Sequence, residues 1–192
     1  MGDWMWSYDP ADGTWTERRA HPVGSRYGFS AANLDGQLVI SGGRGWAGEY
    51  IDDSWAYNTQ ANQWSRLAML SGTQPITLPA TAKQATAASG NSMYIFGGEG
   101  ADGAERNTVW QLQFTRSPTV SVSSLAALPA ARKDAAATIL PPSGFGPQAG
   151  PGTVLIFGGL RAGQAIAETT IYDIGWPYRL HLPVLVRSYQ QQ

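Results

Sequence analysis

The feature that most constrains the fold is a short apolar run that ends in two glycines and occurs three times. The copies are QLVISGG (37–43), SMYIFGG (92–98) and TVLIFGG (153–159). Gly97 follows Gly42 by 55 residues, and Gly158 follows Gly97 by 61 residues. Apolar residues on both faces indicate a strand that is buried on both sides. The Gly-Gly pair permits positive φ and a close approach by another backbone. Three copies at similar spacing predict a repeated architecture.

Three further elements recur around each Gly-Gly run. Alternating aromatic or apolar residues, typical of a half-buried strand, follow it in DSWAYN (53–58), TVWQLQ (108–113) and TTIYDI (169–174), and WMWSYD (4–9) has the same pattern. A tryptophan, Trp15 or Trp64, closes two of the units. A basic residue followed by small residues precedes each run, in SRYGFSAANL (25–34), AKQATAASGN (82–91) and ARKDAAATIL (131–140). Small residues suit an innermost strand, where neighbouring sheets crowd together. The Ala-rich stretch 126–138 is also compatible with a helix, although Pro129 interrupts it.

The segment YDPADGTW (8–15) carries two carboxylates and is compatible with either a metal loop or a tight turn. Its counterpart YNTQANQW (57–64) has the same Tyr-to-Trp spacing and no carboxylate. A metal site is not expected to lose every acid in its sister repeat, whereas Asp and Asn serve turns equally well. The comparison therefore favours a hairpin turn between two strands.

The composition fits an all-β chain and excludes several classes of function. Only 14% of the residues are charged, while the chain holds 23 glycines and 8 tryptophans. A net charge of −1 gives no electrostatic basis for binding nucleic acid or an anionic membrane. The chain has no cysteine, so disulfides, thiol catalysis and zinc-thiolate sites are excluded. No run approaches the roughly 18 apolar residues of a membrane span.

The repeating unit is a set of four strands: one of small residues, the Gly-Gly strand, the Trp/Tyr strand and an outer strand. A four-stranded antiparallel unit that repeats near 50 residues is typical of a β-propeller blade. Through its Gly-Gly pairs, its Trp6/Tyr8/Trp15 and Trp55/Tyr57/Trp64 sets and its Arg26-x-Gly28 start, the chain resembles the kelch-repeat β-propeller family, which includes the central domain of galactose oxidase. The last unit departs from the pattern, because Thr170 replaces Trp.

The fold expected from this resemblance is an all-β, kelch-type propeller of about three and a half four-stranded blades. The expected divisions are the outer two strands of an incomplete first blade (1–20), two blades (21–70 and 71–128), a last blade (129–178) with a Pro/Gly-rich insert (141–152), and a C-terminal tail (179–192). Kelch propellers usually close with six or seven blades. Three arrangements remain open: a piece of a longer protein, two copies that complete one ring, or an open arc.

The sequence leans away from an enzyme. Its two histidines, His21 and His181, lie in unrelated contexts, and there is no G-x-S-x-G elbow. The acids Glu49, Asp52 and Asp53 lack the order of a Ca²⁺ loop. Copper chemistry of the galactose oxidase type needs a Tyr-Cys crosslink, which cannot form here. We therefore expect no cofactor and no metal.

The expected function is non-catalytic binding through one face of loops. The resemblance implies that Arg26, Lys83 and Arg132 occupy corresponding positions on one rim and contact an acidic protein partner. In the alternative interpretation, each pairs with a local acid or carbonyl. Arg44, Trp46 and Tyr50 on the loop after the first Gly-Gly add the residue types that dominate interface energetics.

A carbohydrate-binding or carbohydrate-active propeller is the alternative function, because a tryptophan such as Trp46 also stacks on sugars. The tail LHLPVLVRSYQQQ (180–192) resembles the short LPxxxR-type ends of some secreted bacterial proteins. That similarity favours a location outside a bacterial cell, or on its surface.

Overall fold

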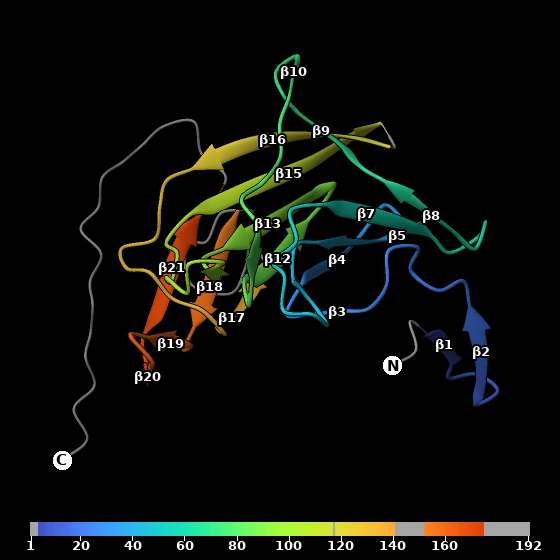
Figure 1. Cartoon of the computed structure of the whole chain (residues 1–192), viewed down its shortest axis with the longest axis horizontal. Helices are drawn as coiled ribbons and strands as arrows, with labels where there is room; N and C mark the ends of the chain where they lie inside the picture. Colours follow the sequence, from blue (N-terminus) through green and yellow to red (C-terminus); the bar gives the residue numbers. More distant parts are fainter. Residues whose placement is uncertain (1–3, 117, 141–151, 175–192) are drawn as a thin grey trace.

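The computed structural model describes residues 4–116, 118–140 and 152–174, and within these ranges every regular element is a β-strand. The all-β prediction is therefore confirmed. Four sheets follow one another along an arc, from the N-terminal hairpin to the last blade (Figure 1). The described ranges contain no helix long and apolar enough to cross a membrane. The predicted insert (141–152) and tail (179–192) lie outside the described residues, apart from Gly152.

Blade 1 is a single hairpin, which we call the N-terminal hairpin, and blade 2 is a complete four-stranded sheet. The hairpin pairs β1 (Met5–Asp9) with β2 (Thr14–Arg18). Blade 2 has the order β4 (Ser30–Leu34), β5 (Gln37–Ser41), β7 (Ser54–Asn58) and β8 (Gln63–Arg66). Short turns join β4 to β5 and β7 to β8, a longer loop joins β5 to β7, and all three pairs are antiparallel.

Blade 3 is the central sheet, and it carries two strands beyond the expected four. Its own strands are β12 (Ala85–Ser89), β13 (Ser92–Phe96), β15 (Val109–Arg116) and β16 (Thr119–Leu125). The added strands are β9 (Ala68–Ser71) and β10 (Gln74–Pro75). Although β9 follows blade 2 in the chain, it pairs in parallel with β16 at the outer edge of blade 3. The blade boundary expected at residue 70 falls within β9.

Blade 4 and three short ladders complete the fold. Blade 4 has the order β17 (Ala136–Ile139), β18 (Thr153–Phe157) and β21 (Thr169–Asp173). The ladders pair β3 (Arg26–Tyr27) with β6 (Arg44–Gly45), β11 (Thr81–Ala82) with β14 (Glu99–Gly100), and β19 (Leu160–Arg161) with β20 (Gln164–Ala165). The Ala-rich stretch forms strand β17 over its C-terminal part, and no helix occurs there.

The acidic segment forms the hairpin turn that the sequence predicted. Tyr8 pairs with Trp15 across the N-terminal hairpin. The side chain of Asp9 accepts a hydrogen bond from the backbone N–H of Ala11 at 2.9 Å, and Asp12 accepts one from Thr14 at 3.0 Å. Asn58 makes the same kind of contact in the sister turn. Both turns are therefore held by side-chain-to-backbone bonds, as Asx turns are.

Hydrophobic clusters between successive blades form the core. One lies between blades 2 and 3 and includes Val39 and Met93, which are both fully buried. The other lies between blades 3 and 4 and includes Phe96 and Ile156. Burying each such side chain stabilises the fold by about 1.5–3 kcal/mol. Because β13 contributes to both clusters, it is buried on both faces, as its unbroken apolar run predicted.

The first two Gly-Gly pairs lie where one blade touches the next. Gly43 donates its N–H to the carbonyl of Thr81 at 2.8 Å, and Gly98 donates to that of Arg132 at 2.9 Å. A Cβ atom on Gly42 would lie 2.7 Å from the Thr81 carbonyl oxygen, so the contact admits no side chain. The close backbone approach expected from the sequence is thus a contact between blades. These bonds bring the ladders of successive blades to one rim of the arc.

Candidate functional site

The short ladders, and the loops that close them, form the rim on which the sequence placed its binding residues. Strand pairing sets their equivalence: Arg26 pairs with Gly45 in the blade 2 ladder, and Thr81 pairs with Gly100 in the blade 3 ladder. Arg132 is the next member, because its carbonyl accepts from Gly98 as that of Thr81 accepts from Gly43. Arg26 and Arg132 are therefore equivalent, as predicted, but Thr81 rather than Lys83 lies between them.

Arg26 and Arg132 are buried and do not form an exposed basic rim. Their side chains are 4% and 2% exposed, respectively. Arg26 donates from Nη1 to Asp53 Oδ1 at 2.7 Å and to the Gly42 carbonyl at 3.2 Å. Arg132 donates from Nη2 to Thr170 Oγ1 at 3.1 Å and lies 3.3 Å from Glu168. Local pairing, the alternative interpretation, describes both residues.

Blade 3 lacks this ion pair, because both its basic and its acidic residue are replaced. Gly42 and Gly158 donate their N–H groups to the carbonyls of Asp53 and Glu168, while Gly97 donates to that of Thr108. Thr108 is thus the equivalent of the two acids, and Thr81 is the equivalent of the two arginines. Burial raises the pKa of Asp53, but the hydrogen bonds from Arg26 and Trp55 and the charges of Arg26 and Arg66 together outweigh it, so the pKa is lowered overall. Losing the base and the acid together avoids an unpaired buried charge.

Lys83 occupies a different position, two residues further along. Its N–H donates to the Gly28 carbonyl at 2.7 Å, and its carbonyl accepts from Asp134 at 2.9 Å. Gly28, Lys83 and Asp134 all have positive φ, between 54° and 62°. The sequence comparison aligned Lys83 with the arginines because each is the first basic residue of its segment. The shared left-handed backbone shows that alignment to be wrong by two residues.

Glu99 is the centre of a polar cluster that sequence reasoning missed. Its carboxylate accepts a 2.5 Å hydrogen bond from the Tyr50 hydroxyl and forms ion pairs with Lys133 and with Lys83, whose Nζ lies 3.5 Å away. These partners come from the three successive blades 2, 3 and 4. Only 9% of the Glu99 side chain is exposed. The hydrogen bonds from Lys133 and Tyr50, aided by the charge of Lys83, lower the pKa of Glu99 to about 2.

A signal for this cluster was present in the sequence. Arg44, Glu99 and Leu160 each directly follow a Gly-Gly pair and pair at equivalent positions, with Tyr27, Ala82 and Lys133 respectively. The side chain at this position is basic in one repeat, acidic in the next and apolar in the third, so the contacts made there differ among the blades. An ionised acceptor already held by three donors is poorly suited to remove a proton from a substrate. The cluster is a fixed ionic junction between blades.

The Arg44–Tyr50 loop adds an exposed aromatic side chain beside this cluster. The guanidinium of Arg44 lies 5.1 Å from the centre of the Tyr50 ring and donates to the Gly48 carbonyl at 2.8 Å. Between them lies the turn closed by Gly45 and Glu49, which carries Trp46. The Trp46 side chain is 71% exposed, and its equivalent in blade 3 is Ala101.

The described residues contain no group of three or more His, Asp or Glu side chains placed to hold a metal ion. His21 packs edge-on against Trp55 and Trp64, with ring centres 5.2 and 4.8 Å away, and so has a packing role. His181 lies outside the described residues. On the rim, Tyr50 and Lys83 are both held by Glu99, while Trp46 is exposed.

Comparison with known proteins agrees with this architecture. The family model described as the KLHDC2/KLHL20/DRC7 Kelch-repeats domain matches residues 2–140, well over half of the chain. Kelch-like protein 24a of Danio rerio is 37% identical over 65 residues, a match that covers 33% of this chain and 10% of that protein. The chain thus spans a small part of the length of this relative. The repeats, the inter-blade glycines and the family match together show that the chain belongs to the kelch-repeat family.

Proposed function

We propose that this chain is a protein-interaction module that binds its partner on the rim around Trp46. The observation that carries the proposal is the 71% exposure of Trp46, a large aromatic side chain on a short turn beside fixed charged groups. Tryptophan is among the residues most enriched at the energetic centres of protein interfaces. Exposing it to water without a partner brings no stability to the blade.

The surroundings of Trp46 define the partner that would fit. Arg44 is held by Tyr50 and the Gly48 carbonyl, so little side-chain entropy is lost when it binds. Lys83, which pairs with the same Glu99 carboxylate that Tyr50 contacts, is 30% exposed. Arg44 and Lys83 are both cationic, which favours a peptide segment with an acidic residue next to an apolar one. Arg26 and Arg132 act behind this surface by holding the ladders in place.

Selection from a displayed peptide library, run in parallel with a glycan array, tests the proposal. We expect selected peptides to carry acidic residues and to lose at least tenfold in affinity on Trp46→Ala. The matched control is Trp4→Ala, because Trp4 is 74% exposed and lies far along the chain from the rim. Peptides that bind both variants equally well would contradict the proposal. Glycan binding that depends on Trp46, without peptide binding, would establish the sugar-binding alternative instead.

A further inference from the structure

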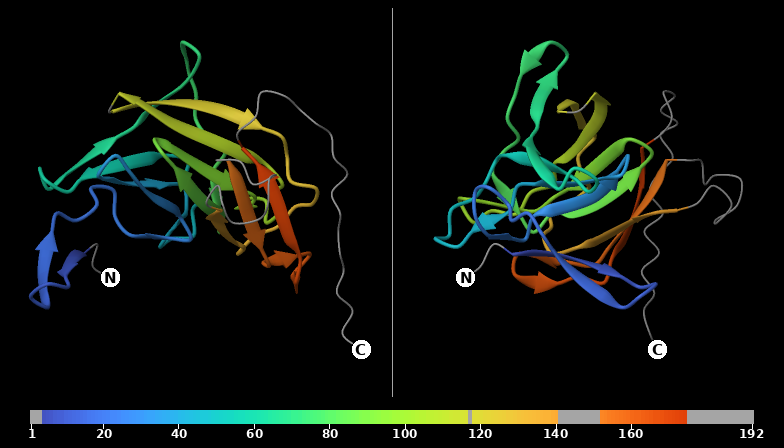
Figure 2. Two further views of the ribbon diagram at one scale, coloured as in Figure 1. Left: turned by 180° about the vertical axis from the view of Figure 1, so that it is seen from behind. Right: turned by 90° about the vertical axis from the view of Figure 1, so that its right-hand side faces the viewer.

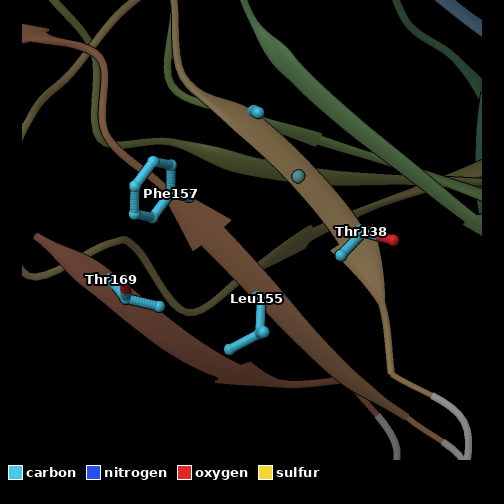
Figure 3. Close-up of a pocket in the computed structure, with 6 residues that line it drawn as sticks. Thr138, Leu155, Phe157 and Thr169 are labelled. Atoms are coloured by element: carbon cyan, nitrogen blue, oxygen red, sulfur yellow. The ribbon is translucent and has the colours of Figure 1, made fainter.

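Blade 4 exposes an apolar face on the side that points away from blade 3. Phe157 is 60% exposed and Ile171 is 64% exposed. They lie on the neighbouring strands β18 and β21, and Leu155 and Thr169 complete the same face (Figure 3). A shallow hollow over these strands and β17 is lined mainly by carbon atoms. Two large apolar side chains side by side on a sheet face indicate a contact surface.

The equivalent face of blade 3 is a contact surface for the next blade. Phe96 and Phe157 both directly precede a Gly-Gly pair, but Phe96 is only 1% exposed. The difference arises because blade 4 covers Phe96. Tyr172 of blade 4 packs edge-on against it, with ring centres 5.4 Å apart. The outward face of blade 4 is thus an inter-blade surface on which no blade of the described residues lies.

The N-terminal hairpin exposes the complementary kind of face. Trp6, Tyr8 and Trp15 are 49%, 51% and 65% exposed. Tyr8 pairs with Trp15 as Tyr57 pairs with Trp64 in blade 2, and Tyr57 in turn has the strand position of Tyr172. Tyr8 is therefore the equivalent of the residue that covers Phe96. The hairpin offers the type of surface that blade 4 lacks on its outer side.

These two faces lie at opposite ends of the arc, with blades 2 and 3 between them (Figures 1 and 2). We propose that they meet between two copies of this chain, so that Tyr8 of each copy packs against Phe157 of the other. The two contacts are related by two-fold symmetry, so the assembly closes and does not grow into a fibre. Two arcs of about three and a half blades fall within the range of about 4–8 blades in which propellers close.

The mass of the 192-residue chain in solution, measured by light scattering over a concentration series, tests the pairing. We expect a dimer, and we expect Phe157→Glu to raise its dissociation constant at least about 30-fold, as loss of a central interface contact does. Val23→Glu is the control, because Val23 is also exposed, at 56%, and lies on neither face. A monomer at every concentration would overturn the proposal, and the apolar face of blade 4 would then need a blade from outside this chain to cover it.

A mixing experiment distinguishes head-to-tail pairing from pairing of like faces. Tyr8→Glu and Phe157→Glu each damage both contacts of a homodimer. An equimolar mixture restores one intact contact, between Phe157 of the first variant and Tyr8 of the second. We expect the mixture to form heterodimers more tightly than either variant pairs with itself. If either variant alone dimerises like the unmodified chain, or if mixing restores nothing, the proposed pairing is wrong. Far-ultraviolet circular dichroism checks that both variants are folded.

Discussion

The substitutions Gly97→Ala and Gly158→Ala form a matched pair that isolates the contact between blades. Both glycines have φ of +64° and open a Gly-Gly pair. Placing alanine in this left-handed region costs about 1–2 kcal/mol at either position. Their surroundings differ, because blade 4 lies against Gly97 and no described blade lies against Gly158.

The structure gives the size of the difference. A Cβ at position 97 would lie 2.4 Å from the Arg132 carbonyl oxygen and 3.1 Å from that of Arg106. Both are backbone atoms, so the blades must shift, and this shift costs about 1–3 kcal/mol more. At position 158 the nearest atom is the Ile166 carbonyl oxygen at 3.5 Å, an ordinary contact. We therefore expect a total loss of about 2–5 kcal/mol for Gly97→Ala and about 1–2 kcal/mol for Gly158→Ala.

Urea denaturation followed by tryptophan fluorescence measures both losses on the same scale. In thermal unfolding, a difference of 1 kcal/mol corresponds to about 2–4 °C for a chain of this size. Equal losses for the two variants would refute the argument, because backbone conformation alone would then account for both. A larger loss for Gly158→Ala would show that another surface covers blade 4 at that point.

Three further outcomes are expected. The pKa of Glu99 is lowered to about 2, so its ionised carboxylate stabilises the fold above the unfolded pKa near 4.3, and this stabilisation is lost as the pH falls towards 2. When the free energy of unfolding is measured against pH, Glu99→Gln should therefore reduce the loss of stability at acid pH. The control Glu17→Gln, at an exposed position, should not. Arg26→Thr should cost about 3–5 kcal/mol by leaving Asp53 unpaired, and adding Asp53→Thr should recover part of it in a double-mutant cycle; strict additivity would mean that the two side chains are not coupled. Trp46→Ala should leave the free energy of unfolding, measured by urea denaturation, within about 0.5 kcal/mol of that of the unmodified chain, because the side chain is exposed, and a larger loss would show that Trp46 supports the blade.

The fold was predictable because the sequence contains repeats, and equivalent positions of these repeats can be compared with one another. Each Gly-Gly pair fixes a strand end by a backbone contact that allows no side chain, so the signal survives in every copy. The turn at Tyr8 was resolved in the same way, by its sister at Tyr57. Sequence reasoning is strong wherever one physical requirement acts on several equivalent positions.

The candidate site was less predictable, because it depends on register and on contacts between blades. Lys83 shares a backbone conformation with Gly28 rather than a side-chain role with Arg26, and residue type alone does not show this. Glu99 became a junction only through Tyr50 and Lys133, which belong to the blades on either side of it. Exposure of Arg26 could not be judged from sequence either, because its burial follows from pairing with Asp53 across 27 residues.

The parallel pairing of β9 with β16 has a consequence for how the protein unfolds. The strand leaves blade 2 along the chain and yet hydrogen-bonds to blade 3, so neither sheet can open without disturbing the other. In arrays of repeats, stability is roughly a sum of unit terms and nearest-neighbour terms, and a shared strand strengthens the neighbour term. Amide hydrogen exchange should therefore find blades 2 and 3 opening as one cooperative unit, with blade 4 opening separately at lower free energy. The cooperative unit of this chain then spans two sequence repeats.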